Sequence, residues 1–224
     1  MTGSRAPHPV AAVVFDLDGV LVDSEELWSA AREQLVRERG GTWPANATRA
    51  MMGMSSPEWS RYLHDELHVD MSPVAISSDV VARLAKLYEQ ELPLLAGATD
   101  TVASLAARWP LGLASSSNRE IIDLVLDRAG LARHFDVTVS SEEVARGKPA
   151  PDVYLEAVRR LDVPREQCVA IEDSENGLRA AAAAHMLVVA VPNRAFPPVG
   201  GALEVAAVVV DSLDELTPSL IESL

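Results

Sequence analysis

Residues 10–24 read VAAVVFDLDGVLVDS, a valine-rich apolar run that stops at two aspartates and a glycine. The part Val10–Leu17 predicts a fully buried strand, because a strand covered on both faces is apolar at nearly every position. The run is far too short to cross a membrane. Asp16 and Asp18 would share one face of a regular strand, and Gly19 lets the backbone turn away afterwards. We therefore expect a buried strand that ends in two carboxylates.

Strand and helix patterns alternate along the chain from Gly97 onward. The expected strands are 111–115, 137–140, 169–172, 187–191 and 206–210, and the expected helices are 99–109, 119–129, 151–161, 175–184 and a short helix near the C-terminus. This alternation predicts a parallel sheet with helices on both faces. Ligands of such sheets bind at the carboxyl ends of the strands, so we expect the functional residues there.

The segment between the first two strands has a different character. It predicts helices at 25–39, 57–67 and 79–92 and contains no convincing strand. The expected fold is therefore α/β, with a doubly wound, Rossmann-like parallel-sheet core and a helical insertion after the first strand. This division assigns residues 1–22 and 95–224 to the core domain and residues 23–94 to the inserted domain.

The composition limits what the protein does. The chain has 224 residues, is 48% hydrophobic and 23% charged, and carries a formal net charge of −14. These values exclude a disordered chain, and the acidic surface argues against nucleic-acid and membrane partners. The single cysteine, Cys168, excludes an internal disulfide and fits the cytoplasm. Residues 1–10, MTGSRAPHPV, lack the apolar stretch of a secretory signal.

Acidic residues follow two of the expected strands. Two carboxylates as close as those of Asp16 and Asp18 repel each other unless a cation neutralises them. The Asp16 side chain and a main-chain carbonyl near Asp18 could surround one hard cation. The segment EDSENG, residues 172–177, adds Glu172 and Asp173 at another strand end. Such oxygen ligands suit Mg²⁺. The alternative is a set of ordinary helix caps, which is compatible with a metal role.

Groups that bind anions follow two other strands. The stretch Ser115-Ser116-Ser117-Asn118 places hydroxyl and backbone N–H groups at the start of a helix, where an anion can bind. The segment RGKPAPD, residues 146–152, places Lys148 in a loop from which it could reach a phosphate. Each signal is unspecific alone, since serine-rich loops and solvated lysines are common. Four such motifs, each at the end of an expected strand, are specific.

In this combination the sequence resembles the haloacid dehalogenase superfamily, in the capped subgroup that includes β-phosphoglucomutase and phosphoglycolate phosphatase. The resemblance covers essentially the whole chain and makes the inserted domain a cap. It implies that Asp16 is the nucleophile and Asp18 the general acid/base. It also implies that Ser115 and Lys148 bind the transferring phosphoryl group. The implied ligands of Mg²⁺ are Asp16, Asp18, Glu172 and Asp173, and Ser116, Ser117 and Asn118 are expected to contact the substrate.

The cap residues bear on whether the enzyme is a phosphatase or a mutase. The β-phosphoglucomutases have a histidine and an arginine at positions where this chain has Trp28 and Ser56. Trp28 suits the wall of a pocket for one organic phosphate, although a core role is equally compatible. We therefore expect a cytoplasmic, Mg²⁺-dependent phosphatase acting on a small phosphorylated metabolite through an aspartyl-phosphate, as a monomer or weak homodimer. The alternatives are a sugar-phosphate mutase and an inactive relative that binds a phosphorylated ligand or a protein.

Overall fold

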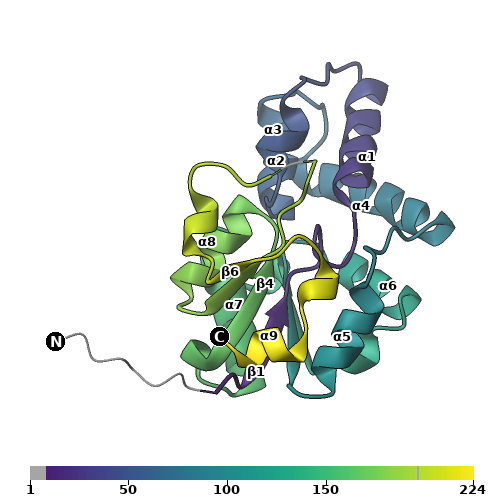
Figure 1. Cartoon of the computed structure of the whole chain (residues 1–224). Helices are drawn as coiled ribbons and strands as arrows, with labels where there is room; N and C mark the ends of the chain where they lie inside the picture. The colour runs from purple at the N-terminus through teal and green to yellow at the C-terminus, as the bar shows by residue number, and fades with distance from the viewer. Residues whose placement is uncertain (1–8, 196) are drawn as a thin grey trace.

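The computed structural model describes residues 9–195 and 197–224, and within them one parallel sheet has the strand order β3-β2-β1-β4-β5-β6 (Figure 1). The strands are β1 (Ala12–Phe15), β2 (Leu111–Ser115), β3 (Val137–Ser140), β4 (Cys168–Glu172), β5 (Leu187–Ala190) and β6 (Val208–Val209). This arrangement confirms the expected α/β fold. Residues 1–8, which the sequence analysis assigned to the core domain, lie outside the described part.

Strand β1 lies in the middle of the sheet and is buried on both faces. Its side chains alternate, so Val13 and Phe15 belong to one apolar cluster, whereas Ala12 and Val14 belong to the other. The first cluster also contains residues of α5 (Ala98–Ala106), α6 (Arg119–Arg128) and α9 (Pro218–Glu222). The second contains residues of α7 (Asp152–Leu161) and α8 (Glu175–Ala183). Helices therefore cover both faces of the sheet.

The ends of the first strand and of several helices differ from the prediction. Strand β1 ends at Phe15, before the chain turns at Gly19, whose φ of 82° favours glycine. The Gly19 N–H donates to the carbonyl of Val22. The inserted helices are α1 (Glu25–Glu38), α2 (Ala47–Met51), α3 (Ser56–Asp65) and α4 (Pro73–Gln90). Helix α4 begins before the predicted residue 79, because Ser72 caps it and Pro73 occupies its first turn. Helix α2 was not predicted.

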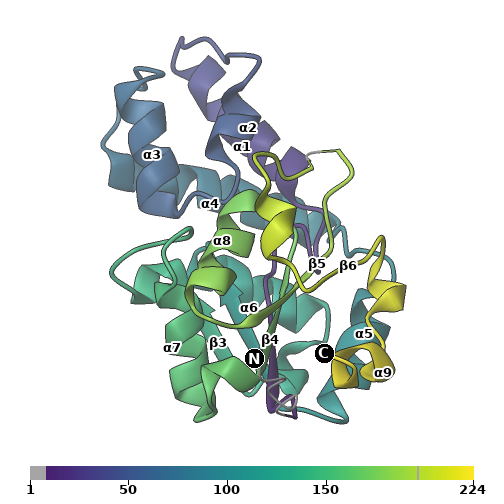
Figure 2. The ribbon, with the colours of Figure 1, turned by 60° about the vertical axis from the view of Figure 1, so that its left-hand side comes forward.

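The inserted helices extend away from the sheet at the end opposite the C-terminus (Figures 1 and 2). The chain leaves and re-enters the sheet region at one place. There the N–H of Asp23 donates to the carbonyl of Pro93, and the N–H of Leu95 donates to that of Leu21. Val22 and Leu94 form an isolated antiparallel bridge between the two crossings. The two crossings of the chain therefore lie side by side, near residues 22 and 95.

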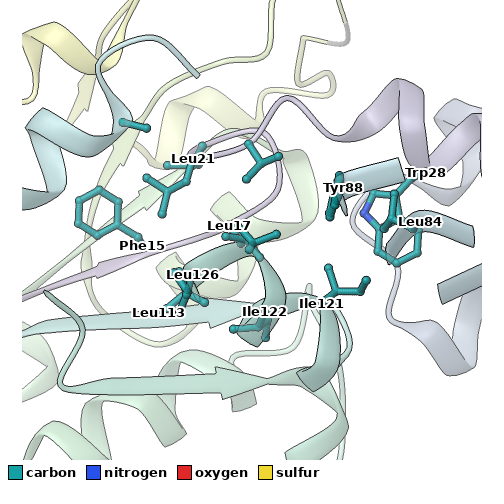
Figure 3. Close-up of a cluster of buried hydrophobic side chains, with 14 of the residues drawn as sticks. Phe15, Leu17, Leu21, Trp28, Leu84, Tyr88, Leu113, Ile121, Ile122 and Leu126 are labelled. Atoms are coloured by element: carbon teal, nitrogen blue, oxygen red, sulfur yellow. The ribbon is translucent and has the colours of Figure 1, made fainter. Parts of the chain in front are cut away.

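The apolar cluster on one face of the sheet continues into the inserted helices (Figure 3). Phe15 and Leu17 lie at its sheet end, and Trp28, Leu84 and Tyr88 lie at its other end, all of them buried. The inserted helices are therefore packed onto the sheet domain. Within residues 9–195 and 197–224, no helix combines the length and the hydrophobicity that a membrane span requires.

Candidate active site

A buried lysine joins acidic residues from two adjacent strands. Strands β1 and β4 pair in parallel, with Phe15 opposite Ile171. The residues that come next along the chain, Asp16 and Glu172, therefore lie beside each other at the carboxyl edge of the sheet. Lys148 Nζ donates to Asp16 Oδ1 at 2.7 Å and to Glu172 Oε1 at 2.6 Å. All three side chains are buried. The structure thus brings together three residues that the sequence motifs placed at separate strand ends.

This cluster holds more negative than positive charge. The carboxylates of Asp16, Glu172 and Asp173 lie together, and Lys148 forms ion pairs with the first two. Burial raises the pKa of Asp16 to about 8, although the Lys148 charge acts to lower it. Burial and the Glu172 charge also raise the pKa of Asp173 well above its usual value. The pKa of Lys148 is raised, since Asp16 and Glu172 outweigh the opposing effect of burial. A second cation would stabilise the charged carboxylates.

The oxygen atoms of this cluster fit a divalent cation. One carboxylate oxygen from each of Asp16, Glu172 and Asp173 lies within 4.8 Å of the others. Among the described residues, the buried Oδ1 of Asp173 has no hydrogen-bond partner. A Cβ on Gly19 would come within 2.0 Å of Asp173 Oδ2, so glycine is required for this approach. A buried oxygen without a partner and an all-oxygen donor set suit Mg²⁺.

Glu172 differs from the two aspartates, because its oxygens are already engaged. Its Oε1 accepts hydrogen bonds from Lys148 and from Tyr154 Oη at 2.7 Å. Its Oε2 accepts from the backbone N–H groups of Asp173 and Ser174 and from the Ser174 hydroxyl. Glu172 therefore positions Lys148 and the 173–174 loop, while Asp16 and Asp173 retain oxygens that can face a cation.

The carboxylate of Asp18 is held from both sides. Trp28 Nε1 donates to its Oδ1 at 3.0 Å, and Ser117 Oγ donates to its Oδ2 at 2.6 Å. Trp28 belongs to α1, whereas Ser117 follows β2, so Asp18 connects the inserted helices with the sheet domain. Two donors, one on each oxygen, fix the orientation of this carboxylate. Trp28 thus reaches an acidic residue as well as lining the pocket.

The last residue of β2 and the three residues after it have different positions. Ser116 and Ser117 line the pocket above Asp16, together with Trp28 and Lys148. Ser115 is fully buried below the loop, where its Oγ accepts from the Ser117 N–H at 3.0 Å. Asn118 bridges two elements, since it accepts from Ser56 Oγ at 2.5 Å and donates to Glu142 at 2.6 Å. In this geometry Ser115 and Asn118 support the loop.

The pocket also contains residues that the sequence analysis did not identify. Its remaining wall comes from the inserted helices and their loops: Glu25, Arg32, Met51, Gly53, Met54 and Trp59. Arg32 follows Trp28 by one helical turn, on the face that also carries the buried Leu35 and Val36. The sequence signal for Arg32 was an arginine at an apolar position of a helix, which does not by itself indicate burial. The structure shows that Arg32 is buried.

The fold is a parallel α/β sheet, and the acidic cluster, the lysine and the pocket lie at its carboxyl edge. The family model for haloacid dehalogenase-like hydrolases matches residues 10–185. The chain belongs to this family, as the sequence motifs predicted.

The relatives of the chain include named phosphatases. Hexitol phosphatase B of Escherichia coli K12 is 33% identical over 198 residues, which cover 83% of this chain and 85% of that protein. A probable pseudouridine-5'-phosphatase of Drosophila melanogaster is 32% identical, with 85% of each chain covered. The structure of CbbY from Rhodobacter sphaeroides in complex with phosphate superposes with a TM-score of 0.83 at 30% identity, covering 96% of this chain and all 100% of that one. These similarities confirm the expected class of enzyme, a phosphomonoesterase.

Proposed function

We propose that the protein is a Mg²⁺-dependent phosphatase that hydrolyses a small phosphorylated metabolite through an aspartyl-phosphate on Asp16. The observation that carries this proposal is the buried cluster itself. Asp16 lies beside Asp173, which has an unpartnered oxygen, and beside the ammonium group of Lys148. The cluster lines a pocket at the carboxyl edge of the sheet, where the organic part of a substrate would be enclosed.

The reaction needs two displacements at phosphorus. An oxygen of Asp16 attacks the phosphorus atom, the bond from phosphorus to the ester oxygen breaks, and Asp18 protonates the departing alcohol. Asp18 then takes a proton from water, whose oxygen attacks the aspartyl-phosphate and releases inorganic phosphate and free Asp16. Trp28 and Ser117 hold Asp18 in position for both proton transfers.

The other charged residues counter the repulsion between Asp16 and a phosphate. Lys148 supplies positive charge beside Asp16, and Glu172 holds its ammonium group. Mg²⁺ held by Asp16 and Asp173, with Asp18 contributing through its main chain, would neutralise and orient the phosphate. Ser116 and Ser117 would line the part of the site that receives the phosphate, and Ser115 would maintain the loop that presents them.

The pocket supports a phosphatase over the mutase alternative. A mutase must hold a second phosphate, yet the two compared positions carry Trp28 and Ser56. The Trp28 indole is engaged with Asp18, and the Ser56 hydroxyl is engaged with Asn118. Neither group is available to a second phosphate in this arrangement. The reported relatives, a hexitol phosphatase and a probable pseudouridine-5'-phosphatase, favour a leaving group rich in hydroxyls.

We further propose that residues 23–94 form a cap domain that closes over the site. Contacts from its 52–55 loop support this role, because Ser116 Oγ donates to the carbonyl of Gly53 and Asn176 Nδ2 donates to that of Met52. The proposal extends to a cytoplasmic enzyme without a nucleic-acid or membrane partner, as a monomer or weak homodimer. The acidic charge and the single buried Cys168 support this location and these partners.

The decisive experiment follows free phosphate and isomerised product separately, for sugar and polyol phosphates with and without Mg²⁺. We expect Mg²⁺-dependent release of phosphate without isomer, and its complete loss in Asp16→Asn. Asp65→Asn is the matched control, because the Asp65 side chain is 63% exposed on α3. Isomer without phosphate would identify a mutase, and undiminished turnover by Asp16→Asn would overturn the nucleophile assignment.

A further inference from the structure

Arg32 is buried between two tryptophans at the wall of the pocket. Its side chain extends from α1, and only 5% of the residue is exposed. Arg32 Cζ lies 4.8 Å from the ring centroid of Trp28 and 4.9 Å from that of Trp59. A guanidinium over an aromatic ring is attracted through its flat face. These contacts hold the group in place without using the N–H donors along its edge.

The guanidinium of Arg32 has no hydrogen-bond or ion-pair partner within residues 9–195 and 197–224, and its buried Nε is unsatisfied. Such an arrangement is costly, because buried donors are normally paired. Burial lowers the pKa of Arg32 to about 10, although the charge of Glu25 acts in the opposite direction. Arg32 lines the pocket, so a ligand bound there could supply the missing hydrogen-bond acceptor. Such a ligand would explain why an unpaired buried guanidinium is kept at this position.

Glu25 places an acceptor in the same pocket. It lies on α1 seven residues before Arg32, which is two helical turns away on one face. Donors from Arg32 and an acceptor from Glu25 match a hydroxyl group, which both accepts and donates. A second anionic group would satisfy Arg32 but would face the carboxyl groups of Glu25 and Asp18. The charge pattern therefore favours neutral hydroxyls.

We infer that Arg32 is a specificity-determining residue, which binds hydroxyl groups of a polyol or sugar leaving group together with Glu25. The inference rests on the proposed function, since the leaving group is that of the phosphate ester bound at Asp16. Trp28 and Trp59 position the guanidinium, and Trp28 also connects this subsite to Asp18. Recognition of the leaving group is thus coupled to the residue that protonates it.

The test uses Arg32→Met, which keeps an unbranched side chain between the tryptophans and removes the donors. Arg37→Met is the matched control, because Arg37 lies on the same helix with its side chain 66% exposed. Both changes are made in Asp16→Asn, and binding of sorbitol 6-phosphate and of inorganic phosphate is measured by calorimetry with Mg²⁺ present. Binding does not require turnover, so this measurement stands apart from the test of the proposed function.

We expect Arg32→Met to weaken binding of sorbitol 6-phosphate by about 10- to 100-fold, which is the usual effect of losing a hydrogen bond to a charged group. Binding of inorganic phosphate changes by less than about twofold, as does every affinity in the Arg37→Met control. Equal losses for both ligands, or no loss for either, would overturn the inference. A larger loss for fructose 1,6-bisphosphate than for fructose 1-phosphate would overturn the hydroxyl assignment, because it would identify a second anion as the ligand.

Thermal stability distinguishes a ligand-binding role of Arg32 from a purely structural role. A structural Arg32 would make Arg32→Met unfold at a lower temperature. If the guanidinium is kept for a ligand, its removal relieves an unsatisfied buried charge, and the melting temperature stays equal or rises. Arg32→Lys retains the charge without the planar donors and should recover little of the lost affinity. The inference would be contradicted by a lower melting temperature in Arg32→Met together with full recovery of the sorbitol 6-phosphate affinity in Arg32→Lys.

Discussion

The indole N–H of Trp28 donates a hydrogen bond to the carboxylate of Asp18 across 3.0 Å, from an inserted helix to the end of the central strand. The same tryptophan ring lies over Arg32 and lines the pocket. One side chain therefore contacts the group proposed to transfer protons and the group proposed to recognise the leaving alcohol. In the proposed mechanism, this residue links closing of the cap to the orientation of the acid.

Trp28→Phe should lower kcat/KM by about 10-fold, because the ring stays while the donor to Asp18 is lost. The loss should appear in kcat, because the Trp28 hydrogen bond orients Asp18 for both proton transfers. Trp109→Phe is the control, since it removes a comparable indole hydrogen bond, to the carbonyl of Val10, at the opposite edge of the sheet. Equal rates for wild type and Trp28→Phe would show that the hydrogen bond is dispensable.

Lys148→Met should destabilise the protein in the absence of Mg²⁺ by about 3 kcal/mol or more, because Asp16 and Glu172 would lose their buried counter-charge. Unfolding by urea in the presence of a chelator measures this change. Lys86, the other lysine of the chain, is exposed, and Lys86→Met is expected to leave stability within about 0.5 kcal/mol of wild type. An unchanged urea midpoint for Lys148→Met would contradict the electrostatic account of the cluster.

Mg²⁺ should stabilise the folded protein by about 2.7 kcal/mol at a concentration 100 times its dissociation constant. This shift should disappear in Asp173→Asn, because a buried oxygen of that carboxylate has no hydrogen-bond partner among the described residues. Thermal unfolding across a Mg²⁺ series checks both statements, with Asp65→Asn as a control that keeps the shift. A full Mg²⁺ shift in Asp173→Asn would remove Asp173 from the metal site.

Glu25 makes stability depend on pH. Burial raises its pKa from 4.5 to about 7, so the folded protein binds this proton more tightly than the unfolded chain does. Its contribution is present below pH 4.5 and is lost as pH rises through 7. Compared with Glu25→Gln, wild type should therefore lose about 3 kcal/mol between pH 4.5 and pH 8. Urea unfolding of both proteins over this range measures the difference, which a constant offset would contradict.

Local patterns predicted most of the fold. The strands at 111–115 and 137–140 have the predicted bounds, because their apolar runs stop at clear turn residues. The inserted helices were harder, since the start of α4 depends on the Ser72 cap and α2 is only a short stretch. Proximity of Asp16 to Asp173 followed from the rule that parallel strands align their carboxyl ends.

The sequence did not predict which side chains contact one another in the site. The engaged oxygens of Glu172 depend on Tyr154, which comes from α7, and nothing near residue 172 in the sequence indicates this contact. The position of Arg32 depends on Trp59, which comes from another helix and lies 27 positions further along the chain. Such contacts arise from how the inserted helices pack, which a motif does not encode.

The antiparallel bridge between Val22 and Leu94 has an evolutionary consequence. Because the chain departs and returns at adjoining points, the distance between these points is independent of how many residues lie between them. Changes of length within this stretch are therefore compatible with an unaltered register of the six strands. Descendants of such a gene can thus acquire new selectivity through one exchangeable segment, while Asp16, Lys148 and Asp173, which lie outside it, are inherited unchanged.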